Sequence, residues 1–202
     1  MIVEELAKLE PARQAVVLLP LAIVLVTCAI TDFRDRKVYN KVTYPAFFIG
    51  LAVHGIAFGG AGLLDGFLAA LIAFCIGLVL LVTGLVGGGD IKLLVVVGAF
   101  LGPAGLAEVT FYSVLAGAVG GLVAALFNGY LVEMFVRLGR WLRGVYRALV
   151  YRTGVMYEKL ERDERSWIPF AIAILVGGIL TWTDAAYAWP GLYEIFLAAW
   201  RV

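Results

Sequence analysis

The chain has 202 residues and a net charge of +1, and its composition is 63% hydrophobic and only 15% charged. Soluble domains contain roughly 45–50% apolar residues, so a soluble fold of this size would leave too much apolar surface in water. We therefore predict a membrane protein. The near-neutral charge argues against a nucleic-acid partner.

The N-terminal residues 1–13 carry acidic side chains and lack the basic region of a cleaved signal peptide. We therefore expect the first apolar segment to be retained as a span. Cys28 and Cys75 lie inside apolar segments and form no CxxC pair, which predicts small buried side chains rather than a zinc site.

Six apolar segments follow one another along the chain, and a span needs about 17–25 such residues. The predicted spans are residues 14–31, 43–59, 62–86, 91–105, 106–135 and 167–183. The second and fourth are short, and Gly129 provides a bend in the fifth. The predicted fold is a single all-α, polytopic membrane domain over residues 1–202. Residues 187–202 form an amphipathic tail with aromatic side chains suited to the membrane interface.

Basic residues concentrate in alternate connections between these spans. Four lie in the first connection, one in the third and eight in the fifth, out of 16 in the chain. The positive-inside rule then places these connections in the cytoplasm and the N-terminus outside, in a plasma membrane. In the long cytoplasmic loop, residues 136–166, arginines and apolar residues fall on opposite sides of a predicted amphipathic helix. That helix is either a platform for substrate or lipid, or a helix that rests on anionic headgroups.

Two acidic residues, Asp32 and Asp90, are predicted at the same cytoplasmic end of the spans. Ionisable groups at the membrane edge are costly and are therefore candidates for function. Asp90 follows Gly87, Gly88 and Gly89, which we expect to release the backbone from the helix and to let a substrate backbone approach closely. Other acids near the spans lie on the outer side or, for Glu133, at the inner end of the fifth span.

Two such carboxylates can hydrolyse a peptide bond without a metal or cofactor. The ionised one deprotonates water, and the protonated one polarises the scissile carbonyl while the pair shares a proton. A structural alternative stays open for each residue, because Asp32 heads a string of charges typical of cytoplasmic loops. Lys92 either tunes Asp90 or substrate binding, or extends its charge toward the membrane surface.

The segment from Val86 to Leu94 reads VGGGDIKLL and resembles the GxGD signature of type IV prepilin and archaeal preflagellin peptidases. The segment from Ile30 to Asn40, ITDFRDRKVYN, resembles the family's other signature, an Asp followed by a basic stretch and Ile-Pro-Asn. Its matching positions are Asp32, Arg34, Arg36 and Asn40, whereas Tyr39 stands where the family has proline. The likeness covers the first four spans, and Pro169 lies in a weaker match at the last span.

The resemblance implies an intramembrane aspartic endopeptidase with Asp32 and Asp90 as catalytic residues. Gly87, Gly88, Gly89 and Lys92 would form the active-site loop, and Arg34, Arg36, Asn40 and Pro169 would shape the loop or touch substrate. The substrate implied is a prepilin-like or preflagellin-like protein whose short basic leader precedes an apolar helix. The expected form is the short, peptidase-only one of Flp-type pilus systems, without an N-methyltransferase region.

Two rival functions remain at this stage, and the sequence does not indicate an oligomeric state. One rival is a small proton- or cation-coupled transporter subunit, although no acid lies near mid-bilayer where such sites occur. The other is an inactive scaffold for pilus assembly. The single histidine, His54, is expected to be a packing residue, since only Ser113 could serve as its nucleophile and no motif links the two. HExxH, P-loop and dinucleotide-binding motifs are absent from the sequence.

Overall fold

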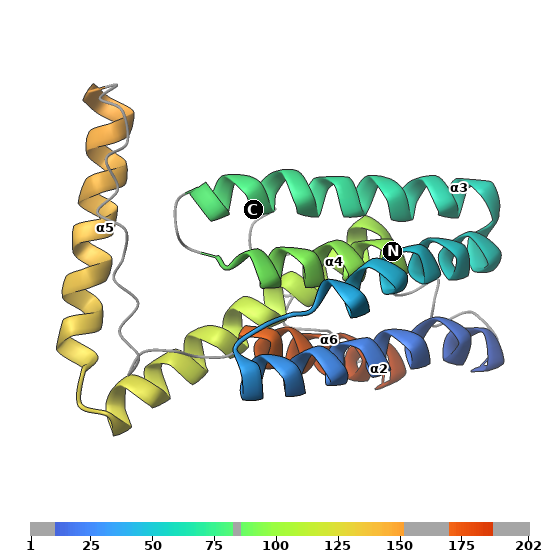
Figure 1. Ribbon diagram of the computed structural model, residues 1–202, viewed down its shortest axis with the longest axis horizontal. Helices are drawn as coiled ribbons and strands as arrows, with labels where there is room; N and C mark the ends of the chain where they lie inside the picture. Colours follow the sequence, from blue (N-terminus) through green and yellow to red (C-terminus); the bar gives the residue numbers. More distant parts are fainter. Residues whose placement is uncertain (1–10, 83–85, 152–169, 188–202) are drawn as a thin grey trace.

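The secondary structure is entirely helical in the computed structural model, which describes residues 11–82, 86–151 and 170–187 (Figure 1). The helices, labelled as in Figure 1, are α2 (Pro11–Asp35), α3 (Asn40–Val82), α4 (Gly88–Phe127), α5 (Leu131–Tyr151) and α6 (Phe170–Tyr187). This confirms the predicted all-α class. By length and composition, α2, α3 and α4 can each cross a membrane, and α6 contributes a shorter apolar helix.

Glycines divide the two longest helices into arms. A straight helix of 43 residues, the length of α3, would measure about 65 Å, roughly twice the thickness of a bilayer core. Gly59 (φ 75°) and Gly102 (φ 67°) instead adopt left-handed backbone angles that glycine tolerates best, and both helices double back there (Figure 1). The resulting arms are residues 40–58 and 60–82 of α3 and residues 88–101 and 103–127 of α4.

These arms overlap the second to fifth predicted spans, with different ends, while the total of six spans stays a prediction. The predicted boundary of the fourth span at residue 105 is wrong, because α4 reverses at Gly102. Pro103 follows directly, and a proline is tolerated at the first position of the new helical arm because no partner for its missing N–H is needed there. The third span, predicted to reach residue 86, ends as a helix at Val82, and residues 83–85 lie outside the described ranges.

The predicted fifth span, residues 106–135, is also too long, since α4 ends at Phe127. Asn128 is the C-cap of α4: its backbone N–H makes a last helical bond to the Ala124 carbonyl at 3.0 Å, and its side-chain amide donates to the same oxygen at 2.8 Å. Gly129 then turns the chain with φ 70°, and α5 begins at Leu131. The bend predicted at Gly129 is therefore a complete break, and Glu133 belongs to α5.

The core forms where α4 packs between α3 and α6, with small residues at the closest approaches. At Gly98, an added Cβ would lie 2.9 Å from the backbone of Ala69 and Ala70. At Gly50, it would lie 2.6 Å from the ring of the buried Phe100. Such close backbone approach is how helices associate in membranes, where burial of apolar side chains provides little driving force.

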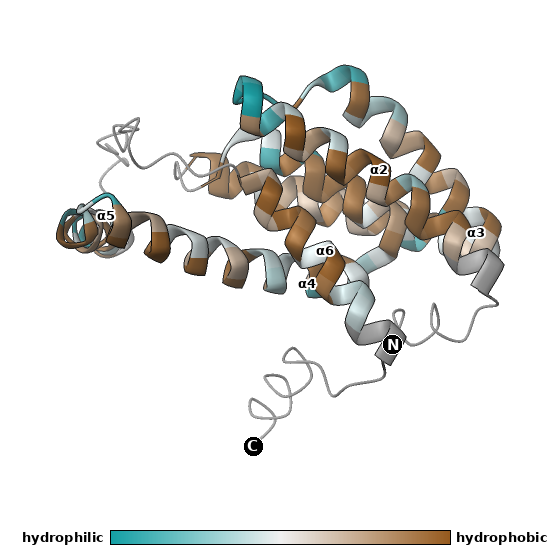
Figure 2. Cartoon of the chain, turned by 90° about the horizontal axis from the view of Figure 1, so that it is seen from below, coloured by the Kyte–Doolittle hydropathy of each residue, from teal (hydrophilic) through white to brown (hydrophobic). Residues whose placement is uncertain are grey.

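Hydrophobic residues predominate along the helices of the bundle (Figure 2), and many of their large side chains are exposed. Ile56 is 80% exposed, Val79 65% and Phe127 88%. A soluble protein rarely presents apolar surface on this scale, whereas lipid chains accommodate it without cost. The outer surface therefore supports the prediction of a membrane protein.

We expect Gly98→Ala to destabilise the bundle by about 1–3 kcal/mol, because the new methyl group would meet backbone atoms that cannot move aside. Gly120→Ala is the matched control, since an added Cβ there has no atom within 4 Å and alanine favours a helix. Thermal unfolding of both variants in detergent measures the difference. Equal unfolding temperatures would contradict the close approach at Gly98.

Candidate active site

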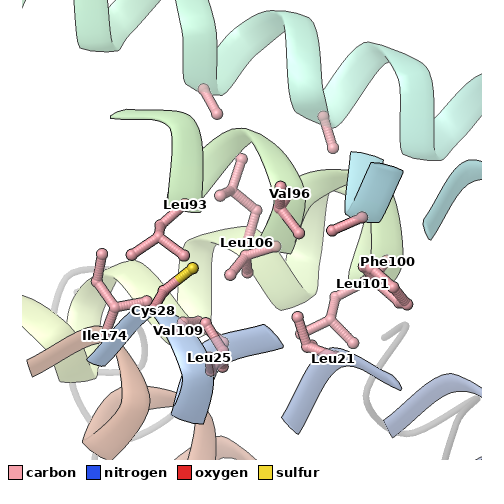
Figure 3. Close-up of a cluster of buried hydrophobic side chains, with 14 of the residues drawn as sticks. Leu21, Leu25, Cys28, Leu93, Val96, Phe100, Leu101, Leu106, Val109 and Ile174 are labelled. Carbon is pink, nitrogen blue, oxygen red and sulfur yellow. The ribbon is translucent and has the colours of Figure 1, made fainter. Parts of the chain in front are cut away.

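Three helix ends define the candidate site, and the core below it fixes their register. Figure 3 shows Leu21 of α2 beside Leu101 of α4 at one end of the buried cluster, and Cys28 beside Leu93 at the other, next to Ile174 of α6. All of these residues are buried. Thus α2 runs antiparallel to the first arm of α4. The two turns of α2 from Leu21 to Cys28 lie alongside the two turns of α4 from Leu101 back to Leu93.

One further turn from Cys28 and Leu93 leads to Asp32 and Asp90, because residues three or four apart share a helix face. The loop after α2 touches the same end of α4, since an added Cβ on Gly89 would lie 3.1 Å from Val38. The two predicted catalytic residues therefore lie at one end of the bundle, on helices that pack together.

Asp32 occupies the last turns of α2 and is only 8% exposed. Its Oδ2 accepts a hydrogen bond of 3.4 Å from the Ala171 N–H, in the first turn of α6. The first N–H groups of a helix lack partners within it, and the helix dipole favours a negative charge there. Asp32 thus satisfies one of these groups, and α6 in turn positions the carboxylate.

Asp90 is held in a comparable way by its own helix. It is the third residue of α4, and its Oδ2 accepts a hydrogen bond of 3.1 Å from the Gly87 N–H. This is the return bond of a capping box, in which the third side chain of a helix bonds back to the N-cap residue. Asp90 is half-buried, so its carboxyl group is oriented by the backbone while it remains partly accessible.

The three glycines before Asp90 have different roles from those predicted. The backbone is outside the helix at Gly87, which has an extended conformation (φ −78°) open to any residue, whereas Gly88 and Gly89 already belong to α4. A side chain on Gly89 would press on Val38, whereas an added Cβ on Gly88 has no atom within 4 Å. Of Gly88 and Gly89, it is therefore Gly88 that has room for a side chain among the described residues.

The loop between α2 and α3 closes without the proline that the family resemblance would place at position 39. Arg36 has a left-handed backbone (φ 53°), and its N–H donates to the Asp32 carbonyl at 2.9 Å, ending α2. The Tyr39 hydroxyl then donates to Asp35 Oδ2 at 3.0 Å, and this hydrogen bond raises the pKa of Tyr39. The sequence did not predict this pairing of Asp35 with Tyr39.

For the remaining predicted site residues, the structure gives their position and exposure. Arg34 and Asn40 are exposed where α2 ends and α3 begins, and Lys92 is half-buried in the first turns of α4. Pro169 lies outside the described residues. Within residues 11–82, 86–151 and 170–187, no three His, Cys, Asp or Glu side chains gather as a metal site. The prediction of a metal-free and cofactor-free reaction stays a prediction.

His54 and Ser113 have structural roles, which confirms that His54 is a packing residue. His54 is 1% exposed, and its Nδ1–H donates to the Phe100 carbonyl at 2.9 Å. That carbonyl lies just before the reversal at Gly102, where regular helical bonding is interrupted. Ser113 is buried and donates to the Val109 carbonyl at 2.5 Å, at the close contact with Gly177.

Sequence reasoning missed three residues: Ala171, whose N–H contacts Asp32, Val38, which contacts Gly89 beside Asp90, and the buried Thr43 near the start of α3. Val38 carries no pattern that would reveal its contact with Gly89, and Ala171 participates only through its backbone. Thr43 is 2% exposed, and its hydroxyl has no hydrogen-bond partner among the described residues. Thr43 lies on the same buried face of α3 as Ala46, one helical turn away. This helical spacing is the sequence feature that could have identified Thr43 as buried.

A family model described as the type IV leader peptidase family matches residues 19–122, more than half of the chain. The matched region runs from α2 into the second arm of α4 and contains both Asp32 and Asp90. Comparison with curated proteins finds no match, and comparison with solved structures finds none either. A match of this extent shows the family that the two signatures indicated. The chain therefore belongs to the type IV leader peptidase family, which implies that it is a membrane-embedded peptidase.

Proposed function

We propose that this protein is an intramembrane aspartic endopeptidase that removes the short basic leader of type IV prepilin-like or preflagellin-like proteins. Asp32 and Asp90 are its catalytic residues. The observation that carries the proposal is that both acids occur at one end of the bundle, one turn beyond the packed layer of Cys28 and Leu93. Family membership supports the peptidase activity independently.

In the proposed reaction, one carboxylate takes a proton from a water molecule while the protonated partner donates a hydrogen bond to the scissile carbonyl oxygen. The water oxygen bonds to the carbonyl carbon, and the tetrahedral intermediate then collapses as the leaving nitrogen receives a proton. Backbone N–H groups hold Oδ2 of each aspartate. This preorientation lowers the entropic cost of aligning the two acids with water and substrate.

Substrate access is supported at Gly88, where no atom of the residues that the structure describes occupies the space that a Cβ would fill. An extended leader needs such an opening to bring its backbone near Asp90. The apolar helix that follows the leader in these substrates would lie in lipid against the exposed apolar surface of the bundle.

The proposed location is the plasma membrane, with the N-terminus outside and the site at the cytoplasmic face. Arg34, Lys37, Lys41 and Lys92 all belong to the helix ends and the loop around the acids. The positive-inside rule assigns that end to the cytoplasm, where prepilin leaders are presented. The transporter and scaffold alternatives predict no cleavage and are tested by the same assay.

Asp32→Asn and Asp90→Asn should each reduce leader cleavage by about a hundred-fold or more, because neither amide can exchange the proton that the reaction requires. Both amide oxygens can still accept the hydrogen bonds from Ala171 and Gly87, so unfolding temperatures should stay unchanged. Asp65→Asn is the matched control, since Asp65 is an exposed acid at the opposite end of the bundle. Native turnover by the Asp90→Asn variant would remove Asp90 from the mechanism.

The proximity of the acids can be tested without activity. In a Cys28→Ala/Cys75→Ala background, cysteines replacing Asp32 and Asp90 should be joined within one chain by a short bifunctional thiol reagent, because their helices pack in the register described above. The control pair replaces Asp65 and Asp90, which lie at opposite ends, and should not react. Mass spectrometry of the intact protein measures both outcomes. Absence of a cross-link in the first pair would refute the paired site.

The two glycines before Asp90 should respond differently to alanine. Gly89→Ala presses a methyl group against Val38 and should lower cleavage by displacing Asp90, whereas Gly88→Ala meets no atom and should keep the fold intact. Adding Val38→Ala to Gly89→Ala removes the closest clashing atom and should restore part of the lost rate. If the double variant is no faster than Gly89→Ala alone, contact with Val38 does not position the acid.

A further inference from the structure

α5 differs from the other helices that the structure describes in having two chemically distinct sides. Arg140, Arg143 and Arg147 are exposed and share one side of the helix, as their spacing of three and four residues requires. The opposite side presents large apolar side chains that are also exposed. Leu138 is 47% exposed and Leu142 53%. A helix of this kind is stable only where an apolar and a charged environment meet.

The orientation of α5 separates it from the bundle. In Figure 1 the helices of the bundle run across the view and α5 stands upright, while Figure 2, turned by 90°, shows α5 end-on. The axis of α5 is thus roughly perpendicular to the bundle helices. If those helices cross the bilayer, α5 lies parallel to the membrane plane.

The position of α5 matches the edge of the membrane. It lies at the end of the bundle where α2 ends and α4 begins, which is the end that holds Asp32 and Asp90 (Figure 1). The chain leaves α4 at Phe127, and the left-handed turn at Gly129 redirects it into α5. Among the described helices only α4 packs against α5 to any extent.

We propose that α5 is a lipid-binding helix that lies in the interface of the membrane at the end holding the two acids. Leu138 and Leu142 enter the boundary between headgroups and acyl chains, and the guanidinium groups of Arg140, Arg143 and Arg147 bind phosphate groups of anionic lipids. Charge complementarity selects this occupant, because a negatively charged bilayer surface offers both the phosphates and the adjoining apolar layer. The proposal is independent of the catalytic role of the aspartates.

The full-length protein is reconstituted in nanodiscs of phosphatidylcholine alone or with phosphatidylglycerol, and hydrogen exchange is followed in peptides covering residues 131–151. Exchange of these amides should slow when phosphatidylglycerol is present, and added salt should reverse the effect. Arg143→Gln/Arg147→Gln should abolish the difference between the two lipids. Lys37→Gln/Lys41→Gln removes the same charge from exposed residues outside α5 and should retain it.

Depth is measured separately with a fluorophore attached to a cysteine at Leu142 or at Gly144, in a Cys28→Ala/Cys75→Ala background. Spin-labelled lipid should quench the probe at Leu142, on the apolar side, more strongly than the probe at Gly144, on the arginine side. Identical exchange in both nanodiscs, or equal quenching at both positions, would overturn the proposal. Protection that requires added leader peptide instead of anionic lipid would also overturn it and would identify α5 as a substrate platform.

Discussion

α2 and the first arm of α4 pack antiparallel, and the register of this packing sets the depth of Asp32 relative to Asp90. A slip of one helical turn would move one acid by about 5 Å along the bundle, which is enough to separate the two carboxyl groups. The contact of Gly98 with the backbone of α3 fixes the first arm of α4, and with it Asp90, along the bundle. The site therefore depends on glycine packing some two turns away from the acids.

Buried polar side chains of this chain form hydrogen bonds with backbone groups at helix ends and reversals. Lipid offers no hydrogen-bonding partner, so an N–H or C=O freed by a helix end or a reversal must be satisfied within the protein. His54 donates a hydrogen bond to the Phe100 carbonyl just before the Gly102 reversal. Asp32 accepts one from the Ala171 N–H at the start of α6. The first arrangement is fully buried and closed. The second uses the carboxylate of Asp32, which is 8% exposed, in the last turns of α2.

The same end of the molecule also gathers the positive charge, in the loop after α2 and along α5. A leader peptidase acts on a substrate that is itself anchored in the bilayer, so its site must stay at a constant depth. An interfacial helix perpendicular to the spans opposes tilting of the bundle relative to the lipid surface. The proposed lipid contacts of α5 and the proposed chemistry of the acids thus both require that the bundle keeps a constant depth in the membrane.

The sequence alone determined the all-α membrane class, the two acids, the amphipathic helix and the family, because apolar length, charge placement and local signatures are properties of consecutive residues. It misplaced the ends of the fourth and fifth spans, since both segments are mostly apolar and mean hydropathy does not mark the break at Gly102 or at Asn128. It assigned all three glycines to one role, whereas only the approach of Val38 from another helix end distinguishes Gly89 from Gly88. The partnership of Asp32 with α6, the register beneath the acids and the direction of α5 were decided by tertiary structure, because each depends on segments far apart in the chain meeting in one orientation.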